Sequence, residues 1–228
     1  MTIVFIISAP SGSGKSTLVN RLYVGKSVTN LNFSISYTTR KARGAEQNAR
    51  EYFFVTREEF EKMVDQDEFL EHADVFGNYY GTARRFLQQA EEQGCDLLLD
   101  IDVQGAAQIK RKLPDAVSIF ILPPNRSELE KRLRERGQDR EEVIQRRLDA
   151  ATREIENYDK YDYILVNDQL EDSVAALQGI LLAERHKRAG KPDPKLTEKA
   201  ESYRLRNVSE RLEPILQSFR EVAAGRGK

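Results

Sequence analysis

The stretch Ser8–Thr17, SAPSGSGKST, separates two segments of different character. Residues 3–7 before it, IVFII, are apolar and mostly β-branched, which is typical of a strand buried on both faces of a parallel sheet. Residues 16–22 after it place apolar side chains at helical spacing. The stretch is therefore a glycine-rich loop between a strand and a helix, the arrangement of a phosphate-binding P-loop.

The small residues of this loop allow backbone N–H groups to turn toward phosphate oxygens, while the helix N-terminus adds partial positive charge. Lys15 would reach the β- and γ-phosphates of a nucleoside triphosphate, and the Ser16 hydroxyl would ligate Mg²⁺. Ala9 stands where the usual pattern has glycine, and alanine fits there if its φ is negative. The residues predicted to bind ATP are Ala9, Pro10, Ser11, Gly12, Ser13, Gly14, Lys15, Ser16 and Thr17.

The composition narrows the class of protein. The chain has 228 residues, 39% hydrophobic and 32% charged, and its formal net charge of -1 argues against general nucleic-acid affinity. No apolar stretch approaches the ~20 residues of a membrane helix, and the N-terminal apolar run lacks the basic lead-in of a signal peptide. We therefore expect a cytoplasmic protein that uses neither nucleic acid nor a membrane. One cysteine, Cys95, excludes an internal disulfide, and two histidines, His72 and His186, argue against a zinc site.

Three further apolar runs predict central strands at residues 96–101 (DLLLDI), 117–122 (VSIFIL) and 163–166 (YILV). Helical patterns separate them, for instance over residues 103–113. This alternation predicts an α/β fold, with a parallel sheet flanked by helices.

Two segments interrupt the alternation. Residues from about 33 to 82 alternate polar and apolar in short pieces, which predicts a small β-rich lobe, and residues 125–159 predict two charged helices joined at residues 136–139. The predicted division is a P-loop core (1–32, 86–123 and 160–188), the inserted lobe (33–85), a helical lid (124–159) and a helical C-terminal extension (189–228).

The charges of the two predicted lid helices allow two interpretations. Most of them are typical of solvated amphipathic helices with i,i+4 pairs. Phosphoryl transfer, however, needs cations over the γ-phosphate, and arginine forks match phosphate oxygens bidentately. Arg132, Arg136 and Arg147 are the leading candidates for this task.

The β-rich lobe carries candidates for a second phosphate site. Arg40 and Arg43 lie three residues apart, and Tyr52 and Tyr80 stand in other short strands. Each residue alone is typical of a protein surface. Together, in one lobe of a P-loop protein, two guanidinium groups and two phenol hydroxyls could surround a phosphate monoester.

Across roughly residues 3–185 the sequence resembles the guanylate kinase family. The motifs that carry the resemblance are SAPSGSGKST, FSISYTTRKARGAE followed by EYFFV, FLEHADVFGNYYGT, LLLDIDVQGA, FILPP with RLRERGQD, and YDYILVND. The resemblance implies a P-loop kinase core with a GMP-binding lobe and a lid, in which the γ-phosphate of ATP passes to GMP with the help of Mg²⁺.

The resemblance also implies roles for individual residues. Those implied to bind GMP are Ser36, Arg40, Arg43, Tyr52, Glu71, Tyr80, Thr82, Asp100 and Asp102, with Asp100 near the phosphates and the metal. The catalytic set is Lys15, Arg40, Arg132, Arg136 and Arg147, and the metal ligand is Ser16. Whether Asp102 acts as a general base or only orients the substrate is open. In this chain RKARGAE, residues 40–46, lacks the proline that the family has at this turn.

The chemistry of the two nucleotides agrees with this interpretation. Guanine presents N1–H and the N2 amino group as adjacent donors, so one carboxylate, Glu71, can accept from both, and a buried mismatch with adenine can discriminate by ~10⁴. The phosphate of GMP has a second pKa of about 6, so at neutral pH it is already a nucleophile and needs no general base. Catalysis would then rest on positioning and charge neutralisation, with the lobes closing to exclude water.

Two alternatives to GMP phosphorylation are open. A guanylate-kinase-like interaction module would be expected to have lost Lys15 or the lid arginines, all of which are present. A related P-loop kinase could act on another phosphorylated small molecule, such as a ribosyl bisphosphate. A panel of acceptors would separate the two kinases.

The C-terminal extension lies outside the resemblance. After a linker-like AGKPDP at residues 189–194, helical spacing relates Leu196, Ala200, Tyr203, Val208, Leu212, Ile215, Phe219 and Val222. Pro214 is expected to break or kink this helix. The apolar stripe either packs against the protein's own core or mediates self-association as a homodimer, and we expect activity to survive removal of the extension.

Overall fold

The computed structural model describes residues 2–25, 28–135, 137 and 140–225, with side chains up to residue 220. The chain forms two compact units. The first comprises Met1–Ile6 and Asn30–Val117, and the second comprises Ile7–Thr29 and Ser118–Lys228. The four-part division made from the sequence stays a prediction.

A five-stranded sheet has the strand order β2-β7-β1-β8-β9. Its strands are β1 (Val4–Ser8), β2 (Leu31–Phe33), β7 (Asp96–Asp100), β8 (Val117–Leu122) and β9 (Tyr163–Val166). The pairs β2–β7 and β8–β9 are parallel. Every residue of β1 and β8 is buried, which explains their continuous apolar runs. The predicted α/β class with a parallel sheet is confirmed.

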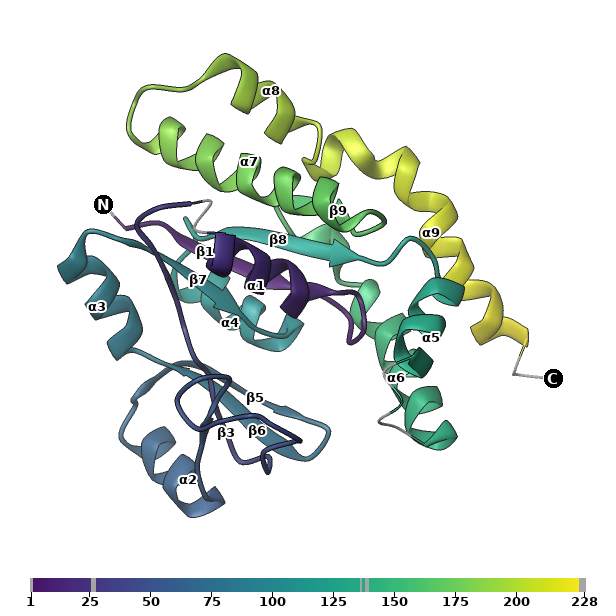
Figure 1. The fold of residues 1–228 in the computed structure, drawn as a ribbon, viewed down its shortest axis with the longest axis horizontal. Helices are drawn as coiled ribbons and strands as arrows, with labels where there is room; N and C mark the ends of the chain where they lie inside the picture. The colour runs from purple at the N-terminus through teal and green to yellow at the C-terminus, as the bar shows by residue number, and fades with distance from the viewer. Residues whose placement is uncertain (1, 26–27, 136, 138–139, 226–228) are drawn as a thin grey trace. The chain divides into compact units, whose positions relative to one another are not determined.

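The first unit also holds a four-stranded sheet of order β4-β3-β6-β5. Its strands are β3 (Tyr37–Thr38), β4 (Phe53–Phe54), β5 (Phe69–Val75) and β6 (Asn78–Ala83), and the helices of this unit are α2 (Arg57–Asp65), α3 (Arg85–Gln93) and α4 (Val103–Lys112). An aromatic cluster of Tyr37, Phe60 and Phe69 with Ala83 forms the core under this sheet. Helix α2 (Figure 1) falls within the segment predicted to be β-rich, and it contributes Phe60 to that cluster.

The second unit is mainly helical around β8 and β9. Its helices are α1 (Lys15–Gly25), α5 (Arg126–Glu135), α6 (Glu141–Ile155), the 3-10 turn η1 (Tyr158–Lys160), α7 (Leu170–Arg188), α8 (Pro194–Glu201) and α9 (Leu205–Gly225). Helices α5 and α6 agree with the two charged helices predicted from the sequence. Helix α8 packs along α7, and α9 contacts α5, α6 and β9 (Figure 1). In the described part of the chain, no helix is both long and apolar enough to cross a membrane.

The apolar stripe of the C-terminal extension packs inside the second unit. Leu212 and Phe219 are each 1% exposed, and Val208, Ile215 and Leu216 are also buried. The stripe therefore packs on the protein's own core, and it does not form the free self-association surface that the alternative interpretation required. The described helical backbone includes residue 222, whose side chain lies outside the described part.

Of the break or kink expected at Pro214, the break is wrong, because α9 runs through this residue, and the kink stays a prediction. Proline removes one N–H group, whose partner would be the carbonyl of Glu210 one turn earlier. Glu210 and Pro214 are both exposed, so water can satisfy that carbonyl. Burial of the opposite face, with Leu212 and Ile215, favours continuation of the helix.

The turn between α8 and α9 covers the edge strand β9. The backbone N–H of Ile164 donates to the Tyr203 carbonyl at 2.9 Å, and Tyr163 forms an antiparallel bridge with Arg204. The Arg204 guanidinium lies 4.0 Å from the centre of the Tyr163 ring and 2.5 Å from the Glu184 carboxylate. Because Glu184 is only 5% exposed, this ion pair neutralises a buried charge.

Replacing Arg204 with alanine should lower the free energy of unfolding by roughly 2–3 kcal/mol, because Glu184 loses its ion pair and keeps the hydrogen bond from the Tyr163 hydroxyl. Urea unfolding followed by circular dichroism measures this loss. Arg206→Ala is the matched control, since Arg206 pairs with Glu201 at the surface and exposed pairs contribute little. Equal losses in the two variants would show that the buried pair contributes nothing of its own.

Candidate active site

The loop between β1 and α1 has the shape expected of a phosphate-binding loop. The backbone N–H of Ser13 donates to the Pro10 carbonyl at 3.1 Å and closes the turn, so this amide does not face inward as the sequence had led us to expect. The Ser13 hydroxyl is completely buried and has no hydrogen-bond partner among the described residues. An orphaned buried hydroxyl in this loop fits a bound phosphate oxygen. Lys15 begins α1 half-buried, and Ser16 and Thr17 are exposed on its first turn.

Two glycines of the loop are fixed by close neighbours. Gly12 and Gly14 have φ of +98° and +89°, which L side chains rarely adopt. A Cβ atom at Gly12 would lie 2.8 Å from Leu129 and 2.9 Å from Leu133, and one at Gly14 would lie 2.3 Å from the side-chain nitrogen of Asn167. The cradle therefore has no room for side chains at either glycine.

Gly14→Ala should weaken ATP binding by about tenfold, because the methyl group forces both a strained φ and a displacement of Asn167. Titration calorimetry with ATP measures the effect. Gly190→Ala is the control: its φ is +69°, but nothing lies within 4 Å of the added atom. An ATP affinity for Gly14→Ala equal to that of the control would exclude the steric role assigned to Gly14.

Asn167 links the loop to α5. This buried residue follows β9, and its side chain donates to the Ser13 carbonyl at 2.8 Å. Its own carbonyl accepts from Arg132 at 3.1 Å, and Arg132 also donates to Glu128 at 2.9 Å. Asn167 is a functional residue that the sequence does not assign, although a polar residue directly after a buried parallel strand is a recognisable signal.

The structure describes the positions of two of the three predicted lid arginines. Arg132 lies on α5 and reaches the neighbourhood of the loop through Asn167. Arg147 lies half-buried on α6. Arg136 lies outside the described residues.

In the first unit, Arg40 organises a cluster of phenol and carboxylate groups. It is 8% exposed, donates to the Tyr80 hydroxyl at 3.1 Å and lies 3.0 Å from Glu46. Its guanidinium lies 5.3 Å from the centre of the Tyr52 ring, and the rings of Tyr52 and Tyr80 lie 5.8 Å apart. The structure thus brings together Arg40, Tyr52 and Tyr80 from three separate segments.

Glu46, which the family resemblance carries over without a stated role, orients this cluster. One of its carboxylate oxygens accepts from Arg40 and the other accepts from the backbone N–H of Arg43 at 2.8 Å. Burial alone would raise the pKa of Glu46, but the hydrogen bonds from Arg40 and Arg43 lower it below its usual value. The Arg43 side chain is exposed, and Ser36 is half-buried, with its carbonyl accepting from Phe53 at 2.9 Å.

A second group of candidates gathers where β5 and β6 meet α4. Glu71 faces Thr82 across the two strands and is 3% exposed. A Cβ at Gly105 on α4 would lie 2.4 Å from the Glu71 carboxylate, so a glycine is required at this approach. Asp102 caps α4, accepting from the Gly105 N–H at 2.8 Å, and Asp100 ends β7 half-buried.

The Glu71 carboxylate is poised between its two charge states. Burial raises its pKa from 4.5 to about 7, and the charge of Asp102 adds to the rise, whereas contacts with Thr82 and the charge of Lys112 oppose it. The Thr82 hydroxyl is fully buried, and it has no hydrogen-bond partner at normal distance and angle among the described residues. A ligand with hydrogen-bond donors would satisfy the Glu71 carboxylate.

The free energy of unfolding of the nucleotide-free protein should fall as the pH rises from about 4.5 to about 7. Over this range folded Glu71 still holds a proton that the unfolded chain has released, so a higher pH favours unfolding. At about 1.36 kcal/mol per pKa unit, the total is roughly 3 kcal/mol. Urea unfolding at a series of pH values measures it.

Glu71→Gln supplies the reference, because glutamine stays neutral throughout. Near pH 5 the wild type and the variant should have similar free energies of unfolding. Toward pH 8 the free energy of unfolding of the wild type should fall progressively relative to that of the variant. A difference between the two proteins that stays constant with pH would contradict the raised pKa.

A glycine cradle with Lys15 at a helix start, together with a buried carboxylate and an arginine–tyrosine cluster in the first unit, defines a nucleotide kinase of the P-loop class. The comparison with known families is more specific. The chain belongs to the guanylate kinase family, whose model matches residues 1–184. This is an enzyme family of nucleoside monophosphate kinases, and its reaction is transfer of the γ-phosphate of ATP to GMP.

Individual guanylate kinases are also similar to this chain. The guanylate kinase of Koribacter versatilis (strain Ellin345) is 57% identical over 226 residues, covering 96% of both chains. That of Escherichia coli (strain K12) is 50% identical over 182 residues, covering 80% of this chain and 88% of its own length. The crystal structure of guanylate kinase from Anaplasma phagocytophilum is similar with a TM-score of 0.66 and 36% identity, covering 80% of this chain and 86% of that one. The membership in the guanylate kinase family, the α/β fold and the reaction that were expected from the sequence are confirmed.

Proposed function

We propose that one GMP molecule is held by the two groups described in the first unit: Glu71 reads the guanine, and Arg40 with Tyr52 and Tyr80 holds the phosphate. One observation carries this assignment. Tyr80 and Thr82 lie on the same strand, β6, with Tyr80 in the arginine cluster and Thr82 opposite Glu71. The strand therefore contributes to a site for the base and to a site for the phosphate, which are the two ends of a nucleoside monophosphate.

The base reader selects guanine by the direction of its hydrogen bonds. Ionised Glu71 has only acceptors, which match N1–H and the N2 amino group of guanine. Adenine has an unprotonated N1 at that place, so two acceptors would face each other without a proton. A buried site left unpaired in this way discriminates strongly. Ser36, Thr82 and Asp102 complete the surroundings of the base, and Arg43 adds a second cation for the phosphate.

The loop of residues 9–17 binds the phosphates of ATP in this proposal. Lys15 pairs with the β- and γ-phosphates, and the buried Ser13 hydroxyl fits a phosphate oxygen. The exposed Ser16 hydroxyl suits Mg²⁺, which prefers oxygen ligands and keeps several of its waters. When bound with ATP, Mg²⁺ would neutralise charge on the triphosphate. Asp100 would lie near the phosphates and the metal.

The residues of this chain have little covalent chemistry to perform. A phosphate oxygen of the GMP dianion forms a bond to Pγ while the bond from Pγ to the oxygen bridging to Pβ breaks, giving GDP and ADP. No proton has to be removed from the nucleophile, so Asp102 needs only to orient the substrate. Lys15 and the arginines Arg40, Arg132, Arg136 and Arg147 stabilise the charge that develops on the transferred group.

We infer further that the protein works in the cytoplasm on ATP and GMP, without nucleic acid or a membrane. The formal net charge of -1 argues against general nucleic-acid affinity and supports this placement. The presence of Lys15 and Arg132 supports an enzyme over an interaction module.

The test is ADP formation from ATP and Mg²⁺ with GMP, AMP, CMP and UMP in parallel, with Lys15→Met as the blank. Turnover is expected with GMP and at least about 10³-fold less with the others. Equal turnover with AMP would remove the role of Glu71 as guanine reader. No turnover with any of them, despite ATP binding, would favour a different acceptor or an interaction module.

A further inference from the structure

Helix α9 lies beyond residues 1–184, the part of the chain that the family model matches, yet it contacts helices of the predicted lid. It packs against both α5 and α6 (Figure 1). Its buried residues Leu212, Leu216 and Phe219 fix this position. The extension is therefore part of the folded second unit, and its contacts with α5 can influence the site that α5 adjoins.

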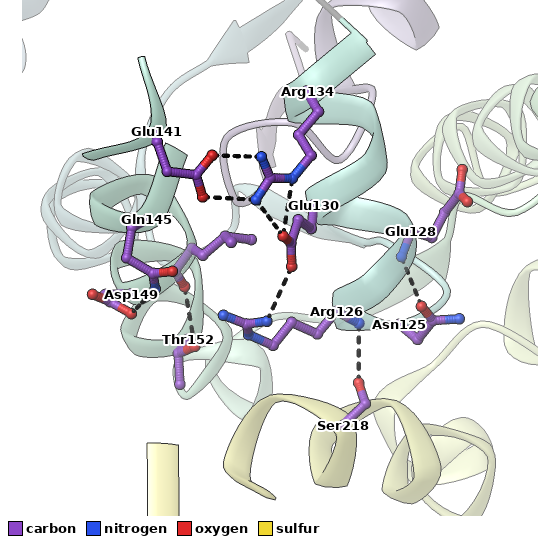
Figure 2. A network of polar contacts seen from close by, with 11 residues as sticks. Asn125, Arg126, Glu128, Glu130, Arg134, Glu141, Gln145, Asp149, Thr152 and Ser218 are labelled. Carbon is purple, nitrogen blue, oxygen red and sulfur yellow. Dashed lines mark hydrogen bonds and ion pairs between the residues drawn. The ribbon is translucent and has the colours of Figure 1, made fainter. Parts of the chain in front are cut away.

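A side chain of α9, Ser218, caps the first turn of α5. The backbone N–H of Arg126, the first residue of α5, donates to the Ser218 hydroxyl at 3.1 Å (Figure 2). That hydroxyl donates in turn to the Ile215 carbonyl at 2.6 Å. The Asn125 side-chain oxygen accepts a hydrogen bond from the backbone N–H of Glu128 at 2.8 Å. First-turn N–H groups have no partner inside a helix, so α5 is capped both by its own neighbour and by a residue 92 positions later.

A chain of charges continues from this cap along α5 to α6. The buried Arg126 side chain lies 3.4 Å from Glu130, which accepts from Arg134 at 2.7 Å. Arg134 also pairs with Glu141 at the start of α6 through two contacts of 2.5 and 2.7 Å (Figure 2). The start of α5 and the start of α6 are thereby tied together.

Two leucines further along α5 contact the phosphate loop. Leu129 and Leu133 are the side chains that leave no room for a Cβ at Gly12. One turn away, Arg132 holds the Asn167 carbonyl, while the Asn167 side chain holds the Ser13 carbonyl. Helix α5 thus contacts both α9 and the loop within the second unit.

We propose that Ser218 is a positioning residue for the donor nucleotide: by capping α5 it sets the place of Leu129, Leu133 and Arg132 against the phosphate loop, and so it tunes affinity for ATP. The proposal rests on the assignment of ATP to this loop. An N-cap of this kind corresponds to roughly a fivefold to tenfold change in an equilibrium constant. The acceptor groups lie in the other unit, so binding of GMP should not change.

The test compares three full-length variants. Ser218→Ala removes the cap, Ser218→Thr retains a hydroxyl, and Ser209→Ala makes the same change at an exposed position of the same helix. Titration calorimetry with ATP gives Kd, steady-state kinetics give the two KM values, and hydrogen exchange reports on peptides around Arg126. Binding of ATP is measured without any acceptor, so this test can be read even if the protein does not phosphorylate GMP.

Ser218→Ala should raise Kd and KM for ATP by roughly fivefold to tenfold, leave KM for GMP unchanged and speed exchange at the start of α5. Ser218→Thr should restore ATP affinity, and Ser209→Ala should behave as the wild type. An unchanged Kd for ATP in Ser218→Ala would overturn the proposal. So would equal increases in KM for ATP and GMP, since those would indicate a general loss of structure.

Discussion

Glu71→Gln should lower kcat/KM for GMP by roughly 10³-fold while leaving KM for ATP unchanged. Glutamine offers one acceptor and one donor, so one of the two guanine donors would face an amide N–H group inside a site that is almost closed to solvent. The loss combines a hydrogen bond to a charged acceptor with an unsatisfied buried donor, each worth about 1.5–3 kcal/mol. Steady-state kinetics at constant ATP measures it.

Glu68→Gln is the matched control, because Glu68 is exposed three residues earlier in the chain. It should keep full activity with GMP. If Glu71→Gln retained the wild-type kcat/KM for GMP, Glu71 could not be the residue that reads the base. A large loss accompanied by an equally large rise in KM for ATP would point to misfolding, which the unfolding curves of the same variant would reveal.

Arg40→Met should lower kcat/KM for GMP by roughly 10²-fold. The arginine is nearly buried and is held in place by Tyr80 and Glu46, so its guanidinium is pre-oriented for a phosphate dianion. Methionine keeps much of the volume but has no charge and no donors. Initial rates over a range of GMP concentrations would show the loss chiefly as a rise in KM.

Arg50→Met provides the comparison, since Arg50 lies in the same segment with 67% of its side chain exposed. It should have the kinetics of the wild type. If the two variants had the same KM for GMP, the phosphate would have to be held elsewhere. Arg40→Lys is informative as well, because a point charge cannot reproduce the fork geometry and should recover only part of the activity.

The parts of the fold that could be predicted from the sequence are those with a strong local signal. The strands β8 and β9 have the predicted bounds, because short, largely apolar runs of that length between helical patterns are typical of buried strands. Helix α2 was missed, although Thr56 and Glu59 form a capping box, TREE, that marks its start. The helix lies inside residues 33–82, for which a small β-rich lobe was predicted.

The parts that could not be predicted depend on distant segments. The partners of Asn167 and Glu46 lie far away in the sequence or across a turn, and their roles follow from the carbonyl and the guanidinium that the fold places beside them. Pro214 shows the reverse case, in which a strong local signal was overridden. The burial of Leu212 and Phe219 against the second unit stabilises α9 beyond what one missing hydrogen bond costs.

The pairing of Glu184 with Arg204 has a consequence for the order of events during synthesis. Glu184 leaves the ribosome twenty residues before Arg204 does. Until Arg204 emerges, the nascent chain can bury Glu184 only as an unpaired charge, which is strongly unfavourable. We therefore expect β9 and α7 to reach their final packing only after Arg204 has left the ribosome, and ribosome-bound chains that still hold residue 204 inside the exit tunnel should be more sensitive to protease than chains from which it has emerged.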